Sequence, residues 1–102
     1  MNKIERISYH ESLMNQAEKA IHQLDEALEQ FPEIQKRLNI LDGYYTSTEW
    51  MEDFEASERG EIPEDVPCGV LSEDGIYNLL EKNRELIDLM KEISEKFGRK
   101  EA

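Results

Sequence analysis

The chain has 102 residues, a length at which one modest hydrophobic core can form without disulfides or a structural metal. Its 24 acidic and 12 basic residues give a net charge of −12, which would repel the phosphate backbone of a nucleic acid. Apolar residues never occur more than two in a row, which excludes a membrane span and a secretory signal, so we expect a cytoplasmic protein that binds neither nucleic acid nor membrane.

The first predicted helix is long and amphipathic. Asn2 and Glu5 have the spacing of a capping box, so the helix should begin almost at the N-terminus. Pro32 should interrupt it, because proline lacks an amide donor and its ring clashes with the preceding turn, and the sequence leaves open whether the proline kinks or breaks the helix. The apolar stripe has alternating spacings of three and four, and consists of Ile7, His10, Met14, Ala17, Ile21, Leu24, Leu28 and Phe31.

Two shorter helices are predicted next. One should begin at Pro32 and stop at Gly43, since proline suits a first helical position and glycine the residue after a helix. The other should span Ser47 to Glu58, with Gly60 ending it. Its start is indicated by a capping box and by a hydrophobic staple, formed by Thr46 with Glu49 and by Tyr45 with Trp50.

Residues 60–71 contain two prolines and two glycines and should form an irregular crossover, with Ile62, Val66, Val70 and Leu71 available to pin it to the core. Ser72 should cap the last helix, and Gly98 should end it before a frayed tail over residues 98–102. That helix has a stripe like the first, formed by Ile76, Leu79, Asn83, Leu86, Met90, Ile93 and Phe97. The prediction is a single all-α domain over residues 1–102, a small antiparallel helical bundle with two long helices.

The stretch from Tyr44 to Leu80 resembles a bacterial family known as domain of unknown function 4298. The motifs that carry the resemblance are YY, EWMEDFEA, G-x-I-P-x-D at Gly60 to Asp65, and GVLSED-x-IY at Gly69 to Tyr77. The resemblance extends more weakly over both flanking helices. It implies a short helical protein and supplies no catalytic or binding residues. Gly75 stands where a better helix former would be expected.

The acidic residues are concentrated in the middle of the chain. Residues 49–74 contain ten acidic residues and one basic residue, whereas residues 75–102 contain six of each. This segment suggests a surface for a basic or helical protein partner, formed by Glu49, Trp50, Glu52, Asp53, Glu55 and Glu58. A weak divalent-cation site is an alternative, but a calcium loop starting at Asp53 would need glycine where Glu58 stands.

No catalytic constellation is visible in the sequence, so we expect no enzyme activity and no cofactor. Cys68 is the single cysteine, which fits a reducing compartment, and both histidines lie in a distant predicted helix. His10 and Asn83 interrupt the two stripes and are interpreted as a half-exposed residue and a satisfied core polar group. The aromatic residues near the short helix are interpreted as core rather than as a recognition surface: Tyr44, Tyr45, Trp50, Phe54 and Tyr77.

Three functional hypotheses therefore stay open. The leading one is a small cytosolic interaction module that uses the acidic segment to bind a protein partner. The second is a protective protein similar to small bacteriocin-immunity bundles, and the third is the weak cation-binding module. Whether the two long stripes face each other within one chain or across a homodimer is also left open by the sequence.

Overall fold

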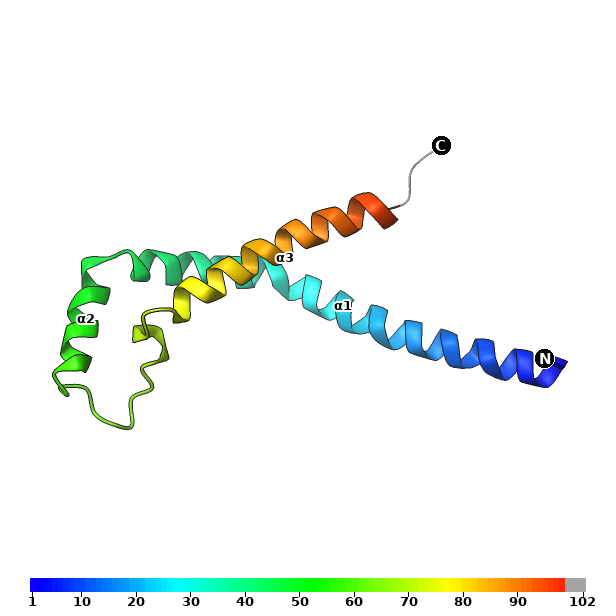
Figure 1. The fold of residues 1–102 in the computed structure, drawn as a ribbon, viewed down its shortest axis with the longest axis horizontal. Coiled ribbons are helices and arrows are strands. Elements are labelled where there is room, and N and C mark those ends of the chain that lie inside the picture. The colour runs from blue at the N-terminus through cyan, green and yellow to red at the C-terminus, as the bar shows by residue number, and fades with distance from the viewer. Residues whose placement is uncertain (99–102) are drawn as a thin grey trace. The chain divides into compact units, whose positions relative to one another are not determined.

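A computed structural model describes residues 1–98 of the chain, and within that range all regular structure is helical (Figure 1). The elements are α1 (Lys3–Tyr45), α2 (Thr48–Glu58), a single 3-10 turn η1 (Gly69–Leu71) and α3 (Gly75–Phe97). The prediction of an all-α protein is confirmed. The chain divides into two compact units, residues 1–37 and the residues from Leu38 on.

Helix α1 begins where the sequence predicts. The side-chain oxygen of Asn2 accepts a hydrogen bond from the backbone N–H of Glu5 at 2.8 Å. The Asn2 amide also donates to the Glu5 carboxylate at 2.6 Å. The first bond occupies a backbone N–H that a helix N-terminus otherwise leaves without a partner, and the second joins the two side chains.

The separate helix predicted from Pro32 to Gly43 does not form, and Pro32 does not break the first helix. Helix α1 contains Pro32 in its interior and continues for 43 residues, past Gly43 to Tyr45. A proline inside a helix costs roughly 3 kcal/mol relative to alanine. Here helical residues on both sides outweigh that cost, so the predicted helix from Pro32 to Gly43 is the C-terminal part of α1.

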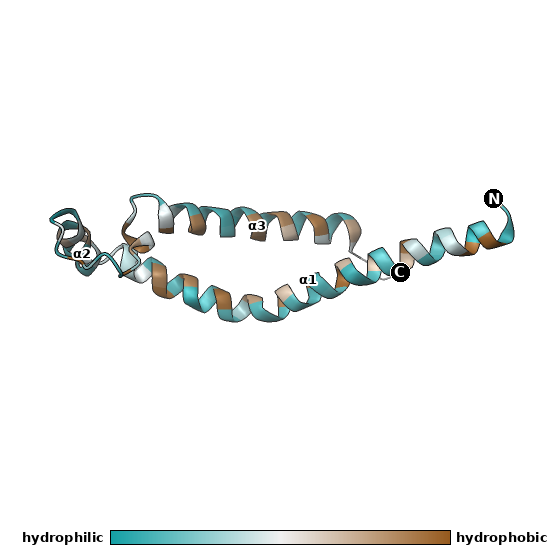
Figure 2. Cartoon of the chain, turned by 90° about the horizontal axis from the view of Figure 1, so that it is seen from below, coloured by the Kyte–Doolittle hydropathy of each residue, from teal (hydrophilic) through white to brown (hydrophobic). Residues whose placement is uncertain are grey.

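Residues 1–37 form a helix without a core. Among them only Phe31 and Gln35 are half-buried, and all the others are exposed. The stripe that was predicted to pack inside a bundle is therefore open to solvent, as Ile7 at 61% and Ile21 at 65% exposure illustrate. Figure 2 shows hydrophobic positions recurring along α1 between hydrophilic ones.

The unit that begins at Leu38 contains a small core. Its buried members are Trp50, Leu71 and Ile76. Half-buried residues from α1, α2, the crossover and α3 pack against them: Leu41, Tyr44, Tyr45, Phe54, Cys68 and Leu80. The core gathers at the junctions between helices, while most of the α3 stripe lies exposed, including Leu79, Leu86, Ile93 and Phe97.

Helix α2 lies close to its predicted limits, but its cap is one residue later. Ser47 Oγ accepts the Trp50 N–H at 3.2 Å and donates to the Tyr44 carbonyl oxygen at 2.6 Å. One hydroxyl thus joins the end of α1 to the start of α2, which corrects the predicted Thr46 cap. After α2, Gly60 has a φ of +74°, a left-handed conformation that favours glycine and ends the helix as predicted.

The crossover is irregular, as predicted, and is held at its end. Leu71 is buried and Ile62 is half-buried, but Val66 and Val70 are exposed and do not pin the segment. Ser72 Oγ donates to the Gly69 carbonyl oxygen at 2.9 Å and accepts the Gly75 N–H at 3.1 Å. Helix α3 therefore begins at Gly75, three residues after the predicted cap.

The structure also explains Gly75. A Cβ at this position would collide with Ser72 Oγ and would lie 2.9 Å from the Gly69 carbonyl oxygen. Only glycine fits this turn without displacing η1. Of the tail predicted over residues 98–102, residues 99–102 lie outside the described part of the chain.

Candidate functional site

The acidic helix α2 is fixed to the core by its aromatic side. The rings of Trp50 and Phe54 are stacked, with centroids 5.3 Å apart and planes 14° from parallel. Tyr45 meets Trp50 edge-on at 5.3 Å, which fulfils the predicted contact between these two residues. These aromatic contacts give α2 a defined orientation.

Trp50 was predicted to belong to the partner surface but is buried in the structure. Its side chain is only 9% exposed, and its indole N–H donates to the Val70 carbonyl oxygen at 2.8 Å. A buried tryptophan with its only donor engaged cannot present itself to a partner. The interpretation of the aromatic cluster as core holds for Trp50, and Tyr77 departs from it, with 52% exposure.

The other predicted surface residues are exposed: Glu49, Glu52, Asp53, Glu55 and Glu58. At 100° per residue, Glu52 and Glu55 lie on the side of α2 opposite Trp50 and Phe54. Within residues 1–98, none of the four glutamates forms a salt bridge. The outward side of α2 is thus a row of solvated carboxylates beside Met51, which is 51% exposed.

Asp53 has a structural contact that the sequence did not reveal. Its Oδ2 accepts a hydrogen bond from the Tyr44 hydroxyl at 2.6 Å. This bond, together with partial desolvation and the negative charge of Asp53, raises the pKa of Tyr44 from 10.0 to about 12. Tyr45 makes a second link, because its hydroxyl donates to the Glu73 carbonyl oxygen at 3.3 Å. Both tyrosines therefore anchor the end of α1 within the unit.

The one basic residue of the acidic segment is already paired. Arg59 Nε lies 2.9 Å from Glu61 Oε1, and its guanidinium holds the pKa of the Glu61 carboxyl below its ordinary value. The pair is exposed on both sides, so it contributes little to stability. Among residues 1–98, the carboxylates of α2 form no salt bridge.

The geometry of α2 does not suit the calcium-loop template. Residues 53–58 belong to a regular helix, whereas the template requires them to wrap around an ion. Within residues 1–98 no group of three or more His, Cys, Asp or Glu side chains is placed to hold a metal ion. Cys68 is half-buried, and its Sγ donates to the Val66 carbonyl oxygen at 3.3 Å.

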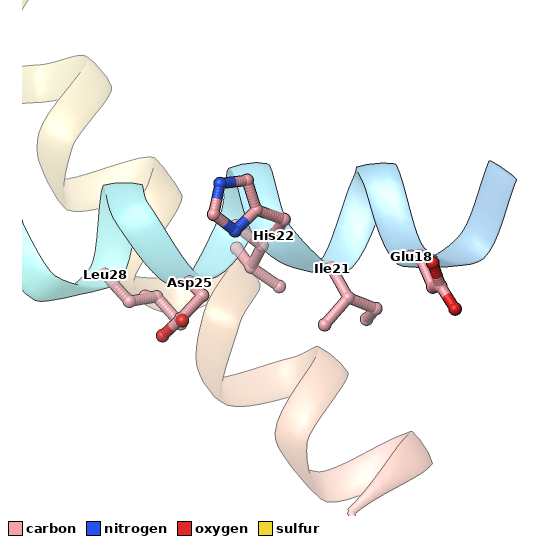
Figure 3. Close-up of a pocket in the computed structure, with 6 residues that line it drawn as sticks. Glu18, Ile21, His22, Asp25 and Leu28 are labelled. Atoms are coloured by element: carbon pink, nitrogen blue, oxygen red, sulfur yellow. The ribbon is translucent and has the colours of Figure 1, made fainter. Parts of the chain in front are cut away.

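Two open grooves lie on α1, and the sequence interpretation did not identify them. The first lies over the middle of the helix (Figure 3), and is lined by Glu18, Ile21, His22, Leu24, Asp25 and Leu28. The second is nearer the N-terminus and is lined by Arg6, Ile7, His10, Glu11 and Met14. In Figure 3 the Ile21 and Leu28 side chains project to the same side of α1. Each groove combines members of the apolar stripe with flanking charges.

Each of the two histidines contacts a residue one turn away on α1. His10 is exposed, and its Nδ1 lies 2.7 Å from the Arg6 carbonyl oxygen. His22 Nε2 lies 3.0 Å from Glu26 Oε1, one turn along the helix. The other interrupting residue, Asn83, is half-buried on α3.

Comparison with known proteins identifies one family model, described as a domain of unknown function (DUF4298), which matches residues 7–93. Neither the curated proteins nor the solved structures contain a match to the chain. A membrane crossing would need a long apolar helix, and none occurs among residues 1–98.

Proposed function

The chain belongs to the family described as a domain of unknown function (DUF4298), and on that premise we propose that it is a protein-interaction module. Its acidic helix α2 binds a basic segment of another protein. The carboxylates that make this contact are Glu49, Glu52, Glu55 and Glu58, with the exposed Met51 beside them.

The observation that supports this proposal is that the two sides of α2 differ: one packs against the core and the other is charged and exposed. The inward side of the helix is occupied by Trp50 and Phe54, which hold it against Leu71 and the rest of the core. The outward side carries Glu52 and Glu55, which are exposed and form no salt bridge among residues 1–98. A helix that is fixed on one side and charged on the other offers a preorganised surface, so a partner does not have to order it.

Charge supports a basic partner over an acidic or neutral one. Residues 49–74 contain ten acidic residues and a single arginine, and that arginine pairs with Glu61. A cluster of this sign accelerates encounter with a positively charged surface and disfavours nucleic acid. The contact should therefore weaken as salt screens it.

The proposed activity is binding without a chemical step. We place it in the bacterial cytosol, because a lone cysteine suits a reducing compartment and the resembling family is bacterial. The immunity and cation hypotheses are ranked below it, since no feature of α2 favours either.

The test is a calorimetric titration with a synthetic amphipathic peptide that carries lysine on one side and leucine on the other. We expect the full chain to bind it at an ionic strength of about 0.05 M and to bind at least tenfold more weakly at about 0.5 M. The double variant Glu52→Lys/Glu55→Lys should abolish binding. Asp53 is kept in this variant because Tyr44 needs it.

A matched control separates a specific surface from overall acidity. Asp88→Lys/Glu95→Lys makes the same change of charge at two exposed positions of α3. We expect this variant to bind the peptide within about threefold of the wild type. Equal losses in the two variants would mean that the peptide senses only net charge, and the acidic surface of α2 would be abandoned as the binding site.

A further inference from the structure

Helix α1 presents an uncovered apolar face over residues 7–31. Ile7 and Ile21 on this face are 61% and 65% exposed, and Leu24 is 53% exposed. Isolated helices are marginally stable in water, because most helix stability in proteins comes from packing an apolar face. A helix with so exposed an apolar face therefore requires an apolar cover.

We propose that the cover is the same face of a second copy of the chain, and that two α1 helices form a parallel, in-register coiled coil. The stripe repeats strictly every 3.5 residues through more than three heptads, which is the signature of a coiled-coil seam. Positions a are Ile7, Met14, Ile21 and Leu28, and positions d are His10, Ala17, Leu24 and Phe31.

The charges beside the seam select the parallel orientation. The row after each d position contains Glu11, Glu18 and Asp25, all exposed. In an antiparallel pair this row would face itself, carboxylate against carboxylate, which is unfavourable. In a parallel pair it faces the row of residues that come directly before each a position. There Arg6 of one chain lies beside Glu11 of the second copy.

The row before each a position also contains residues small enough for two helices to pack closely. It continues after Arg6 with Leu13, Ala20 and Ala27, which add apolar area and leave room for close approach. Residues 1–37 carry seven acidic and five basic residues, so overall repulsion between two copies is small. The strongly acidic residues 49–74 lie outside the proposed seam.

The grooves on α1 have the composition that this packing needs. In a coiled coil each knob inserts into a hole formed by four residues of the facing helix. One groove is lined by Ile21, Leu24 and Leu28 of the seam. The other brings Arg6 and Glu11 to the same groove as Ile7 and Met14, so the pairing charges flank the apolar positions that they would align.

The first test is the molar mass of the full chain by light scattering at about 100 μM, a concentration that populates complexes of micromolar Kd. We expect twice the 12.0 kDa of one chain. Ile21→Glu should halve that mass, whereas Gln23→Glu, on the outer side of the same helix, should leave it unchanged. A single-chain mass for the wild type, or a larger assembly, would overturn the proposal.

Orientation is tested by oxidation of single cysteines in a Cys68→Ser background. A parallel, in-register pair brings position 14 of both chains together at the seam and keeps position 12 on the outside. Met14→Cys should therefore form a disulfide-linked dimer in high yield, and Ser12→Cys should not. A dimer that crosslinks at neither position would instead pair α1 antiparallel or with α3 of the second copy, and would refute the inference.

This inference is independent of the binding role assigned to α2. Glu52→Lys/Glu55→Lys should leave the molar mass in solution unchanged. Ile21→Glu should leave binding of the basic peptide to α2 unchanged. Loss of one property without the other distinguishes failure of the coiled coil from failure of the acidic surface.

Discussion

Residues 1–37 and the unit that begins at Leu38 are both helical, but they are organised by different forces. The first region has no buried residue, whereas the second buries Trp50, Leu71 and Ile76 around an aromatic junction. Apolar residues spaced three and four apart occur in both. The comparison teaches that a periodic stripe determines which residues share a face, and that bulky side chains at helix junctions determine where a core forms.

The core of the second unit depends on contacts between distant residues. Trp50 bonds to Val70, twenty positions away, and Tyr45 bonds to Glu73, 28 positions away. Helix α1 over residues 3–37 is instead maintained by local bonds and by whatever covers its stripe. A mutation in the core should therefore affect one unit alone. Four experiments test this and other parts of the comparison.

The largest effect is expected for Trp50→Ala. It removes the ring stack with Phe54, the edge contact with Tyr45 and the bond to Val70, at a cost of about 3–5 kcal/mol. Such a loss should unfold the unit that begins at Leu38, as followed by amide NMR signals, while signals from residues 3–30 persist. Met51→Ala, at an exposed neighbour, should change stability by under about 0.5 kcal/mol. If both regions unfold together, the division into units is refuted.

Pro32→Ala changes the other region of the comparison, residues 1–37. It restores an amide donor inside α1 and removes a steric clash, so it should stabilise the helix by up to about 3 kcal/mol. Thermal unfolding followed by circular dichroism should show a higher midpoint. Glu33→Ala at the next position is the control and should alter stability by less than about 0.5 kcal/mol. A lower midpoint for Pro32→Ala would mean that the proline stabilises α1.

Two glycine substitutions should have opposite signs. Gly75→Ala places a Cβ against Ser72 Oγ and the Gly69 carbonyl, and should destabilise the second unit by about 1–3 kcal/mol. Gly43→Ala lies in the interior of α1, where the new Cβ would meet no atom within 4 Å beyond its chain neighbours and the helix's own backbone, and should stabilise by about 0.5–1 kcal/mol. Urea titration measures both. Stabilisation by Gly75→Ala would show that η1 moves aside freely.

The smallest effect concerns Tyr44. Tyr44→Phe removes the hydrogen bond to Asp53 and should cost about 0.5–1.5 kcal/mol in urea titration. Since folding raises the pKa of this phenol from 10.0 to about 12, its contribution is complete below pH 10 and is lost as the pH rises towards 12.

An NMR titration of tyrosine labelled at the ring carbon that bears the hydroxyl follows this ionisation directly. In Asp53→Asn, the pKa of Tyr44 should fall back towards 10.0, because the charge and most of the bond strength are lost. An unchanged titration of Tyr44 in that variant would show that Asp53 is not the cause.

Local patterns predicted much of this fold. The Asn2 cap, the extent of α2, the stop at Gly60 and the irregular crossover all depend on neighbouring residues, and all were predictable from sequence. Pro32 misled the prediction because a proline's cost is local, while a long helix can absorb it. Gly75 was an apparent anomaly, since the obstacle that requires it is a hydroxyl held in place by Gly69.

The candidate site was predictable only in part. The acidic residues of α2 were identified from charge density, and their exposure follows from the helix period. Trp50 was assigned to the surface because its hydrogen-bond acceptor, the Val70 carbonyl, leaves no trace in the local pattern. The Tyr44–Asp53 bond was missed for the same reason, because it joins two helices across a corner made by Ser47.

The half-buried Cys68 thiol is a chemical probe of the crossover, because its rate of alkylation can be measured. The thiol is hydrogen-bonded to the Val66 carbonyl and packs against the core, so both contacts should slow alkylation by a bulky maleimide. The rate of alkylation, compared with that of the unfolded chain, therefore reports how well the crossover protects this thiol. Because the thiol is the only one in the molecule, mass spectrometry can read this alkylation rate in a mixture with any partner, without adding a label elsewhere.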